Sequence, residues 1–323
     1  MEHHNSGIGG QAVLEGIMMR NQEKYSIAAR KENGEIELTV KPYKTTIPIK
    51  GIEKIPILRG VSSFIDSLVV GISSLMWSAD VVAQEEEEEK KVKTEKEQAK
   101  EDRIWKFVMT VTVMISICFS VVLFMLLPFW LAGLLRRTGL SDVWVNLLEA
   151  VLRIVIFLGY MLVISNMKDI QKVYAYHGAE HKCINCIENG MELTPQNVLK
   201  CSRQHKRCGT SFMLIVICIS VVFFLILGLF GIKSRLWRLL WRLILIPVIA
   251  GVSYEILRFA AVSENRCVAV MTKPGLALQK LVTREPDEKE AEVAIAAIEA
   301  VFDWRTWQKE HFGDAAAEAE KNV

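Results

Sequence analysis

The stretch FVMTVTVMISICFSVVLFMLLPFWLAGLL, residues 107–135, contains no charged residue. A second uncharged stretch, GTSFMLIVICISVVFFLILGLFGI, covers residues 209–232. An α-helix rises about 1.5 Å per residue, so about 20 apolar residues cross the roughly 30 Å of a membrane's hydrocarbon core. Both stretches are longer than that and predict membrane-spanning helices, which excludes a wholly soluble protein. Residues 1–4 do not start a basic segment followed by an apolar one, so we expect no secretory signal peptide.

Two further segments are apolar enough to cross a membrane although they carry charges. Residues 143–167 contain Glu149 and Arg153, and residues 236–262 contain four charged side chains. The second of these segments begins with tryptophans beside arginines, which is typical of a membrane interface. We therefore expect about four transmembrane helices. A soluble buried helix is the alternative for residues 236–262.

Two charges fall well inside these predicted spans. Arg153 and Glu255 lie where an unpaired charge costs about 3 kcal/mol or more. We expect both to face the interior of the helix bundle and to pair, with Arg258 sharing Glu255. The pair would either fix the packing of the helices or line a polar cavity.

The distribution of Lys and Arg predicts the orientation of the chain. Fourteen of them lie directly before the first span or between the second and third, against six in the other two loops. Because Lys and Arg are enriched in cytoplasmic loops, we expect a multi-pass protein of the cell membrane with both termini and the long middle loop in the cytoplasm. The chain has seven cysteines. Cytosolic thiols stay reduced, so a cluster of them in the middle loop should bind metal or react rather than form disulfides.

The overall charge bears on partners. The formal net charge is +2 and the isoelectric point is near 8.1. A nucleic-acid-binding protein would carry a stronger basic excess, so no nucleic acid partner is expected. Membrane lipid is the partner that the spans imply, and a membrane protein or a cytosolic protein is the other partner we expect.

The parts outside the spans show weaker patterns. Residues 24–30 and 36–42 alternate apolar and polar side chains around Asn33-Gly34, which predicts a β-hairpin with a type I′ turn. Residues 61–79 place apolar and polar residues on opposite helix faces, which favours an amphipathic helix, lying on the membrane or packed against the helix bundle, over a fifth span. Pro286-Asp287 marks the start of a second amphipathic helix.

These elements give the predicted fold class: a membrane all-α core of about four transmembrane helices, a small N-terminal β-hairpin element, and cytoplasmic amphipathic helices. The expected parts are a β element, an amphipathic helix with a charged linker helix, a membrane domain with a cytoplasmic metal-site loop, and a helical C-terminal segment. Their boundaries are 1–57, 58–103, 104–262 with the loop at 168–210, and 263–323.

The cytoplasmic loop concentrates residues that bind metals. Histidines four residues apart on a helix project from one face, as two ligands of a single metal ion require. His177 and His181 have this spacing, and Glu180 completes an H-x-x-E-H string, the order in which inverzincins use the glutamate as general base toward metal-bound water. The ligand-type residues of the loop are His177, His181, Cys183, Cys186, Cys201, His205 and Cys208.

A closed structural site is the competing arrangement in the same loop. Cys183 and Cys186 followed by His205 and Cys208 have the spacing of a Cys3His zinc ribbon. Such a site holds four protein ligands and has no catalytic position. The spacing alone does not separate the two arrangements.

The glycines at positions 7, 9 and 10 allow two interpretations. They could form a backbone anion cradle at a helix N-terminus, or they could make a tight packing turn. No Lys-Ser/Thr pair follows them, so they do not form a Walker A loop. Glu15 and Arg20, which follow shortly afterwards, could reach the metal loop from the same side of the membrane.

Several motifs together resemble the YqhQ-like family of multipass bacterial membrane proteins, which are described as predicted metal-dependent enzymes. The matching runs are GGQAVLEGIMMR (9–20), YHGAEHK (176–182), HKRCGTSF (205–212) and TREPD (283–287). The resemblance implies a bacterial inner membrane location and a metal, and it names no reaction. It implies a site made of His177, Glu180, His181, His205, Arg207, Cys208, Thr210 and Ser211, without the thiols at 183 and 186. Lys206 stands where the family pattern has proline.

We therefore expect a divalent metal, most plausibly zinc, held by His177 and His181 with His205 or Cys208. The leading hypothesis is a metal-dependent hydrolase with Glu180 as general base and with Arg207 or Ser211 near the developing negative charge. The alternative is a zinc-stabilised membrane scaffold or assembly factor with a closed site. A metal carrier is disfavoured because the spans lack a ladder of His, Asp or Glu.

Overall fold

The computed structural model describes residues 4–49, 51–88, 95–135, 139–230, 234–263 and 265–313. The chain folds into two compact units, each built from discontinuous segments. Unit 1 comprises Met1–Glu85, Ile164–Val216 and Ala250–Val323, and unit 2 comprises Glu86–Val163 and Ile217–Ile249. The predicted charged helix around residues 85–93 lies partly outside the described residues.

Unit 1 contains a four-stranded antiparallel sheet whose strands lie in chain order. The predicted hairpin is confirmed, and two strands that the sequence did not predict precede it. Glu15 (φ 50°) and Gln22 (φ 42°) make the tight turns that join these extra strands to their neighbours, without the Asn-Gly signal that predicts such turns. The strands are β1 (Gly9–Val13), β2 (Gly16–Asn21), β3 (Lys24–Arg30) and β4 (Ile36–Pro42).

The turn between β3 and β4 differs from the predicted type. A type I′ turn needs positive φ at both Asn33 and Gly34, but only Gly34 has it, at 90°. Gly34 N donates to Lys31 O (3.0 Å), and Lys31 N donates to Glu35 O (2.8 Å). The connection is therefore a longer loop that ends on a left-handed glycine, so the type I′ prediction is wrong.

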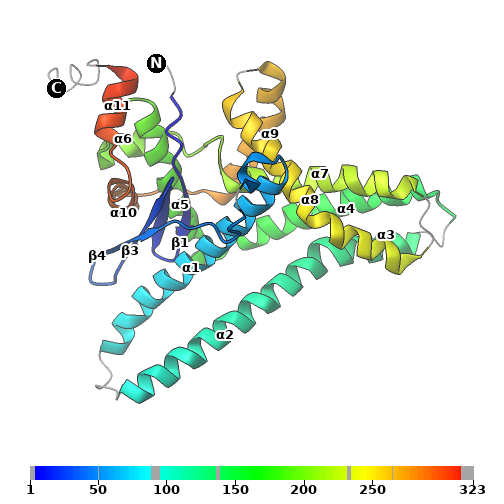
Figure 1. The fold of residues 1–323 in the computed structure, drawn as a ribbon, viewed down its shortest axis with the longest axis horizontal. Helices are drawn as coiled ribbons and strands as arrows, with labels where there is room; N and C mark the ends of the chain where they lie inside the picture. Colours follow the sequence, from blue (N-terminus) through cyan, green and yellow to red (C-terminus); the bar gives the residue numbers. More distant parts are fainter. Residues whose placement is uncertain are drawn as a thin grey trace. The chain divides into compact units, whose positions relative to one another are not determined.

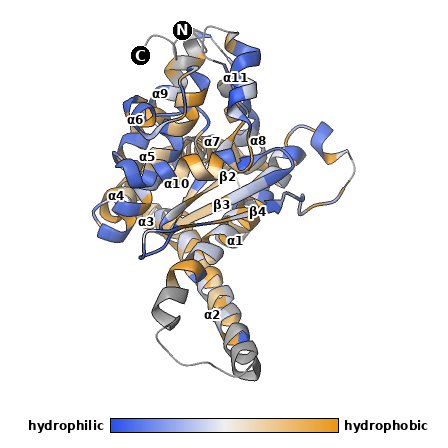
Figure 2. Ribbon diagram, turned by 90° about the vertical axis from the view of Figure 1, so that its left-hand side faces the viewer, coloured by the Kyte–Doolittle hydropathy of each residue, from blue (hydrophilic) through white to orange (hydrophobic). Residues whose placement is uncertain are grey.

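The two central strands of the sheet, β2 and β3, are buried on both faces in unit 1. Ile17, Met19 and Ala28 face a core formed with α5 (Lys168–Glu188) and α10 (Glu288–Glu299). The alternate residues of the strands face α1 (Leu58–Glu88), so α10 and α1 lie on opposite sides of the strands (Figure 2). The helix predicted to start at Pro286-Asp287 is confirmed as α10, which begins with a capping box of Asp287 and Glu290.

The remaining helices complete both units (Figure 1). A π-helical turn, η2, joins α2 to α3, directly before Pro128, whose ring and missing N–H disturb an α-helix. The bounds are η1 (Ile52–Lys54), α2 (Glu95–Val121), η2 (Val122–Leu126), α3 (Leu127–Leu135), α4 (Asp142–Ile164), α6 (Pro195–Lys200), α7 (Gly209–Leu229), α8 (Arg235–Val262), α9 (Arg266–Val282) and α11 (Trp304–Phe312).

By length and composition, five helices in the described part of the chain are able to span a membrane, one more than the four predicted. This identifies a membrane protein with a mostly helical fold. The additional candidate is α1. The five are Leu58–Ala83, Arg103–Leu135, Val143–Ile164, Gly209–Leu229 and Leu236–Ala260.

The polarity of α1 is inverted relative to a helix of a soluble protein. Its polar stripe is buried, whereas Leu68, Val69 and Leu75 are about half exposed. Asp66, in the middle of the stripe, accepts hydrogen bonds from Tyr43 Oη (2.9 Å), Thr45 Oγ1 (3.0 Å) and Thr46 N (2.6 Å). Apolar side chains facing outward are expected where lipid replaces water. The buried polar residues of the stripe are Ser62, Asp66, Ser74 and Ser78.

The predicted pairing of Arg153 with Glu255 is wrong. Arg153 Nη2 donates instead to Glu149 (3.1 Å), because residues four apart on one helix are neighbours. Glu255 accepts from Arg59 Nε (2.7 Å) at the start of α1. Each of the two charges therefore has a partner closer to it than the other one.

We expect Asp66→Ala to reduce stability by about 2 kcal/mol or more, because it removes the buried acceptor that three donors of the 43–46 segment share. Thermal unfolding of the detergent-solubilised protein measures the loss. Ser67→Ala is the matched control, since Ser67 is the exposed neighbour and bonds only within α1, to Ser63 O. Equal unfolding temperatures for the two variants would contradict the role given to Asp66.

Candidate metal centre

Helix α5 carries the H-x-x-E-H string and packs against the chain near Arg284. His177 and His181 lie one turn apart on one face, with ring centroids 4.4 Å apart. Between them, Gly178 passes so close to the neighbouring segment that a Cβ there would lie 2.1 Å from Arg284 O. Glycine weakens a helix, and here the close approach explains why it is present.

Cys208 joins the two histidines from the start of α7. His177 Nε2 lies 3.2 Å from Cys208 Sγ, and one ligand atom from each of the three residues lies within 4.8 Å of the others. Zinc binds nitrogen at about 2.0–2.1 Å and sulfur at about 2.3 Å, so its ligand atoms are expected roughly 3–4 Å apart. The three residues therefore fit a divalent metal. In the described residues, they form the one group of three or more His, Cys, Asp or Glu with this proximity.

The outer hydrogen bonds of the three residues orient their ligand atoms. His177 Nδ1 donates to Val282 O (2.9 Å), and His181 Nδ1 donates to Arg203 O (2.6 Å). A carbonyl oxygen only accepts, so each Nδ1 carries the proton and each Nε2 keeps a lone pair for a metal. Thr210 N donates to Cys208 Sγ (3.4 Å), which helps to orient the sulfur.

Glu180 lies buried beside β1. Burial raises the pKa of its carboxyl group, although the charge of His177 and a hydrogen bond from the backbone N–H of Gly10 act in the opposite direction. A Cβ on Gly10 would lie 3.0 Å from Glu180 Cδ, so this glycine makes room for the carboxylate. Gly10 belongs to a strand, which excludes the anion cradle at a helix N-terminus, one of the two interpretations of these glycines. The anionic group that its N–H contacts is the Glu180 side chain.

His205 and Arg207 belong to a neighbouring network around Glu188. His205 Nε2 lies 3.3 Å from Glu188 Oε2, and Arg207 pairs with the same carboxylate. Ser6 adds hydrogen bonds from its N (2.8 Å) and Oγ (2.7 Å). Burial tends to raise the pKa of Glu188, but these partners outweigh it and lower the pKa to about 2. The sequence did not single out Glu188, which has no motif around it.

His205 is adjacent to the three-ligand group but is not part of it. Its ring centroid lies 5.8 Å from that of His181, and its Nε2 faces Glu188. The sequence left open whether His205 or Cys208 is the third ligand. In the structure, Cys208 lies beside the histidine pair. Ser211 N donates to Cys208 O (3.1 Å), and its Oγ accepts from Gln279 Nε2 (3.0 Å) on α9.

The cysteines of the predicted zinc ribbon are not assembled with His205 and Cys208. Because α5 continues as a helix to Glu188, Cys183 and Cys186 lie on a different face from the histidine pair. Both thiols are fully buried in the hydrophobic core, and Cys186 Sγ donates to Glu192 O (3.3 Å). Burial raises the pKa of Cys183, which disfavours the thiolate that a metal needs.

Glu15 and Arg20, which the sequence placed near the loop, have other partners. Glu15 pairs with Lys172 on α5 (2.6 Å). The Arg20 guanidinium lies 3.5 Å from the centre of the Tyr43 ring. Neither residue belongs to the three-ligand group.

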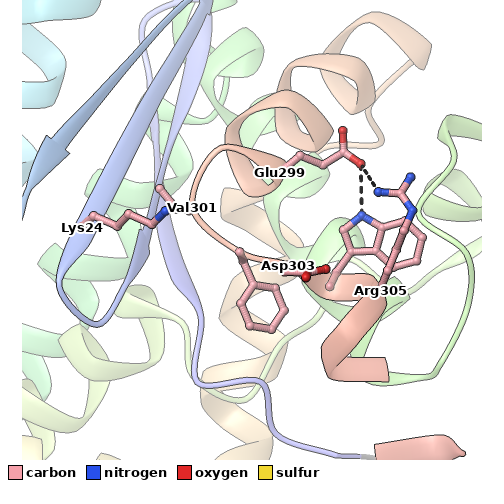
Figure 3. A pocket seen from close by; sticks show the side chains of 7 residues that line it. Lys24, Glu299, Val301, Asp303 and Arg305 are labelled. Atoms are coloured by element: carbon pink, nitrogen blue, oxygen red, sulfur yellow. Dashed lines mark hydrogen bonds and ion pairs between the residues drawn. The ribbon is translucent and has the colours of Figure 1, made fainter. Parts of the chain in front are cut away.

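A separate hollow of about 280 Å³ lies beside the α10–α11 connection (Figure 3). Glu299 there accepts hydrogen bonds from Trp304 Nε1 (3.1 Å) and Arg305 Nη1 (3.2 Å). Glu299 and Arg305 therefore have partners within the protein. The residues that line it, none of them a metal-site residue, are Lys24, Glu299, Val301, Phe302, Asp303, Trp304 and Arg305.

We expect Gly178→Ala to weaken zinc binding about tenfold or more without removing a ligand, because the methyl group displaces the Arg284 segment and with it the Val282 carbonyl that orients His177. Competition with a zinc-binding dye measures the affinity. Gly159→Ala is the control, since a Cβ at this helical glycine meets nothing within 4 Å. Equal zinc affinity in both variants would contradict this account.

Comparisons with known proteins agree with the family suggested by the motifs. Residues 55–304 match the model of a family described as "Protein of unknown function (DUF1385)". The chain is also 34% identical over 290 residues to the "Uncharacterized protein YqhQ" of Bacillus subtilis (strain 168), with 89% of each chain covered. No solved structure matches it. The chain therefore belongs to the DUF1385, or YqhQ-like, family.

Proposed function

We propose that this membrane protein binds zinc through His177, His181 and Cys208 and catalyses a hydrolytic reaction. The observation that carries the proposal is the number of ligands. Structural zinc sites usually hold four protein ligands, whereas catalytic sites hold three and keep one position open. The described residues bring three ligands together and place a buried carboxylate, Glu180, next to one of them in the chain.

In this proposal, zinc, when bound, would supply a Lewis acid that activates water. Glu180 would be the general base, and burial raises the pKa of its carboxyl group. The Gly10 N–H holds one side of this carboxylate. Arg207 and Ser211 act as positioning residues, because Glu188 and Gln279 already bind their polar atoms.

A structural zinc site is the second candidate. The hydrogen bonds of the two histidines end on the carbonyls of Arg203 and Val282, so the group ties α5 to the 201–208 loop and to the end of α9. A metal there would stabilise the assembly of three separate segments. This role needs the ligands and does not need the carboxylate of Glu180.

We expect Cys208→Ala and His181→Ala to lose bound zinc, and Glu180→Gln to keep full zinc stoichiometry with a water in the fourth position. Metal analysis and X-ray absorption of the purified full-length protein measure both quantities. Cys186→Ala is the matched control and should keep its zinc, because Cys186 lies outside the group. Zinc retained by Cys208→Ala would contradict the site.

Genetic complementation separates catalysis from structure. In a strain that lacks this gene and shows a phenotype, Glu180→Gln should fail to complement if Glu180 is the general base. Full complementation by a zinc-loaded Glu180→Gln variant would support the scaffold or assembly role, in which the protein engages a membrane or cytosolic protein partner.

We also propose that the metal centre, the sheet and both termini lie on the cytoplasmic side, and that α1 does not cross the membrane. The sheet packs against α5 and α10 in unit 1, so all three lie on one side. The chain between β4 and α5 must therefore cross an even number of times, although three candidate spans lie between them. The α2–α3 segment and α4 supply two crossings, and α1 is left lying along the membrane.

Reporter fusions test this topology. A reporter fused after residue 85 should read as cytoplasmic, as should one fused after residue 190, because no net crossing separates them. A reporter fused after residue 139 should read as periplasmic and serves as the control. A periplasmic result after residue 85 would show that α1 crosses and would contradict the proposal.

A further inference from the structure

Unit 2 contains a buried cluster of three charged side chains. Glu149 and Arg153 come from α4 and Arg242 from α8, and each is at most 5% exposed. Arg242 binds Glu149 through both of its terminal nitrogens, with Nη2 2.9 Å from Oε2. Arg153 binds the same carboxylate (3.1 Å) and donates to Ser220 Oγ on α7 (3.0 Å).

The charges of this cluster do not balance. Two guanidinium groups share one carboxylate, which leaves a net charge of about +1, because arginine stays protonated in proteins. Glu149 is the only acidic residue in residues 143–163. Residues 107–135 and 217–249 contain no acidic residue, so these segments offer no second negative charge to balance the arginines. An uncompensated charge inside a membrane protein is costly and marks a functional site.

Each of the two guanidinium groups also has a buried N–H group that donates to no acceptor in the described part of the chain. Arg153 Nε and Arg242 Nε are both inaccessible to solvent and have no hydrogen-bond partner among the residues that the structure describes. The Phe224 ring lies 4.7 Å from the Arg153 guanidinium and 4.8 Å from that of Arg242, which lowers the cost of the charge without neutralising it. Unsatisfied buried donors next to excess positive charge fit a missing anion.

We propose that this cluster binds an anionic phosphate group inside the membrane unit, with Arg153 as the main electrostatic contact. Guanidinium groups bind phosphate oxygens through charge-assisted hydrogen bonds, which is the chemistry that the unpaired N–H groups offer. The phosphate comes from a phospholipid headgroup or from inorganic phosphate. This site is independent of the zinc centre, because its residues lie in unit 2 and the metal ligands in unit 1.

Binding of two probes to the full-length protein in a zwitterionic detergent tests the proposal. Phosphatidylglycerol binding is followed by native mass spectrometry, and inorganic phosphate binding by equilibrium dialysis. Binding of phosphatidylglycerol alone identifies a lipid headgroup as the source, and binding of inorganic phosphate identifies a free anion. Binding of neither probe by the wild-type protein would overturn the proposal.

Variants assign the binding to the cluster. Arg153→Gln leaves Glu149 and Arg242 as a neutral pair and should weaken binding about tenfold or more, the effect of losing one charged hydrogen bond. Glu149→Gln raises the net charge and should bind at least as tightly as the wild type, and Arg153→Lys should keep most of the affinity. Arg258→Gln, at an exposed position of α8, is the control. Unchanged affinity in Arg153→Gln would overturn the assignment.

Discussion

The close contact between α5 and the segment around Arg284 positions the candidate metal centre. Arg284 N donates to Tyr174 O (2.8 Å), and one turn later Gly178 leaves no space for a side chain against Arg284 O. This contact brings the Val282 carbonyl to His177 and keeps the end of α9 beside α5. Two of the ligands come from α5 and the third, Cys208, lies directly before α7. The approach between backbones helps to orient His177 through the Val282 carbonyl.

The same helix separates three chemical environments on its different faces. His177 and His181 face Cys208, Cys183 and Cys186 enter the hydrophobic core, and Glu188 holds His205 and Arg207. The buried Glu188 carboxylate is compensated by its cationic and hydroxyl partners, which is why its pKa falls despite burial. Residues that are close together in the sequence therefore belong to two separate polar groups, the three-ligand group and the network around Glu188.

The buried charged side chains of the two units differ in how far their charges are balanced. In unit 1, buried acids such as Asp66 and Glu188 have full sets of donors. In unit 2, positive charge exceeds negative charge in the buried cluster, and two guanidinium nitrogens have no acceptor. Buried guanidinium Nε atoms without a partner occur in both units, so the excess of positive charge is what distinguishes the cluster of unit 2.

The sequence by itself determined the four strongly apolar segments, the β3–β4 pairing, the capped start of α10 and the pair of histidines, because each follows from local periodicity or spacing. It did not show β1 and β2, whose turns use Glu15 and Gln22 in a conformation unusual for these residues. Only the tertiary structure decided that Cys208, rather than His205 or the Cys183–Cys186 pair, meets the histidines, and that the polar face of α1 is the buried one. Both depend on distances between segments far apart in the chain, and a helical pattern distinguishes two faces without telling which of them meets protein and which meets lipid.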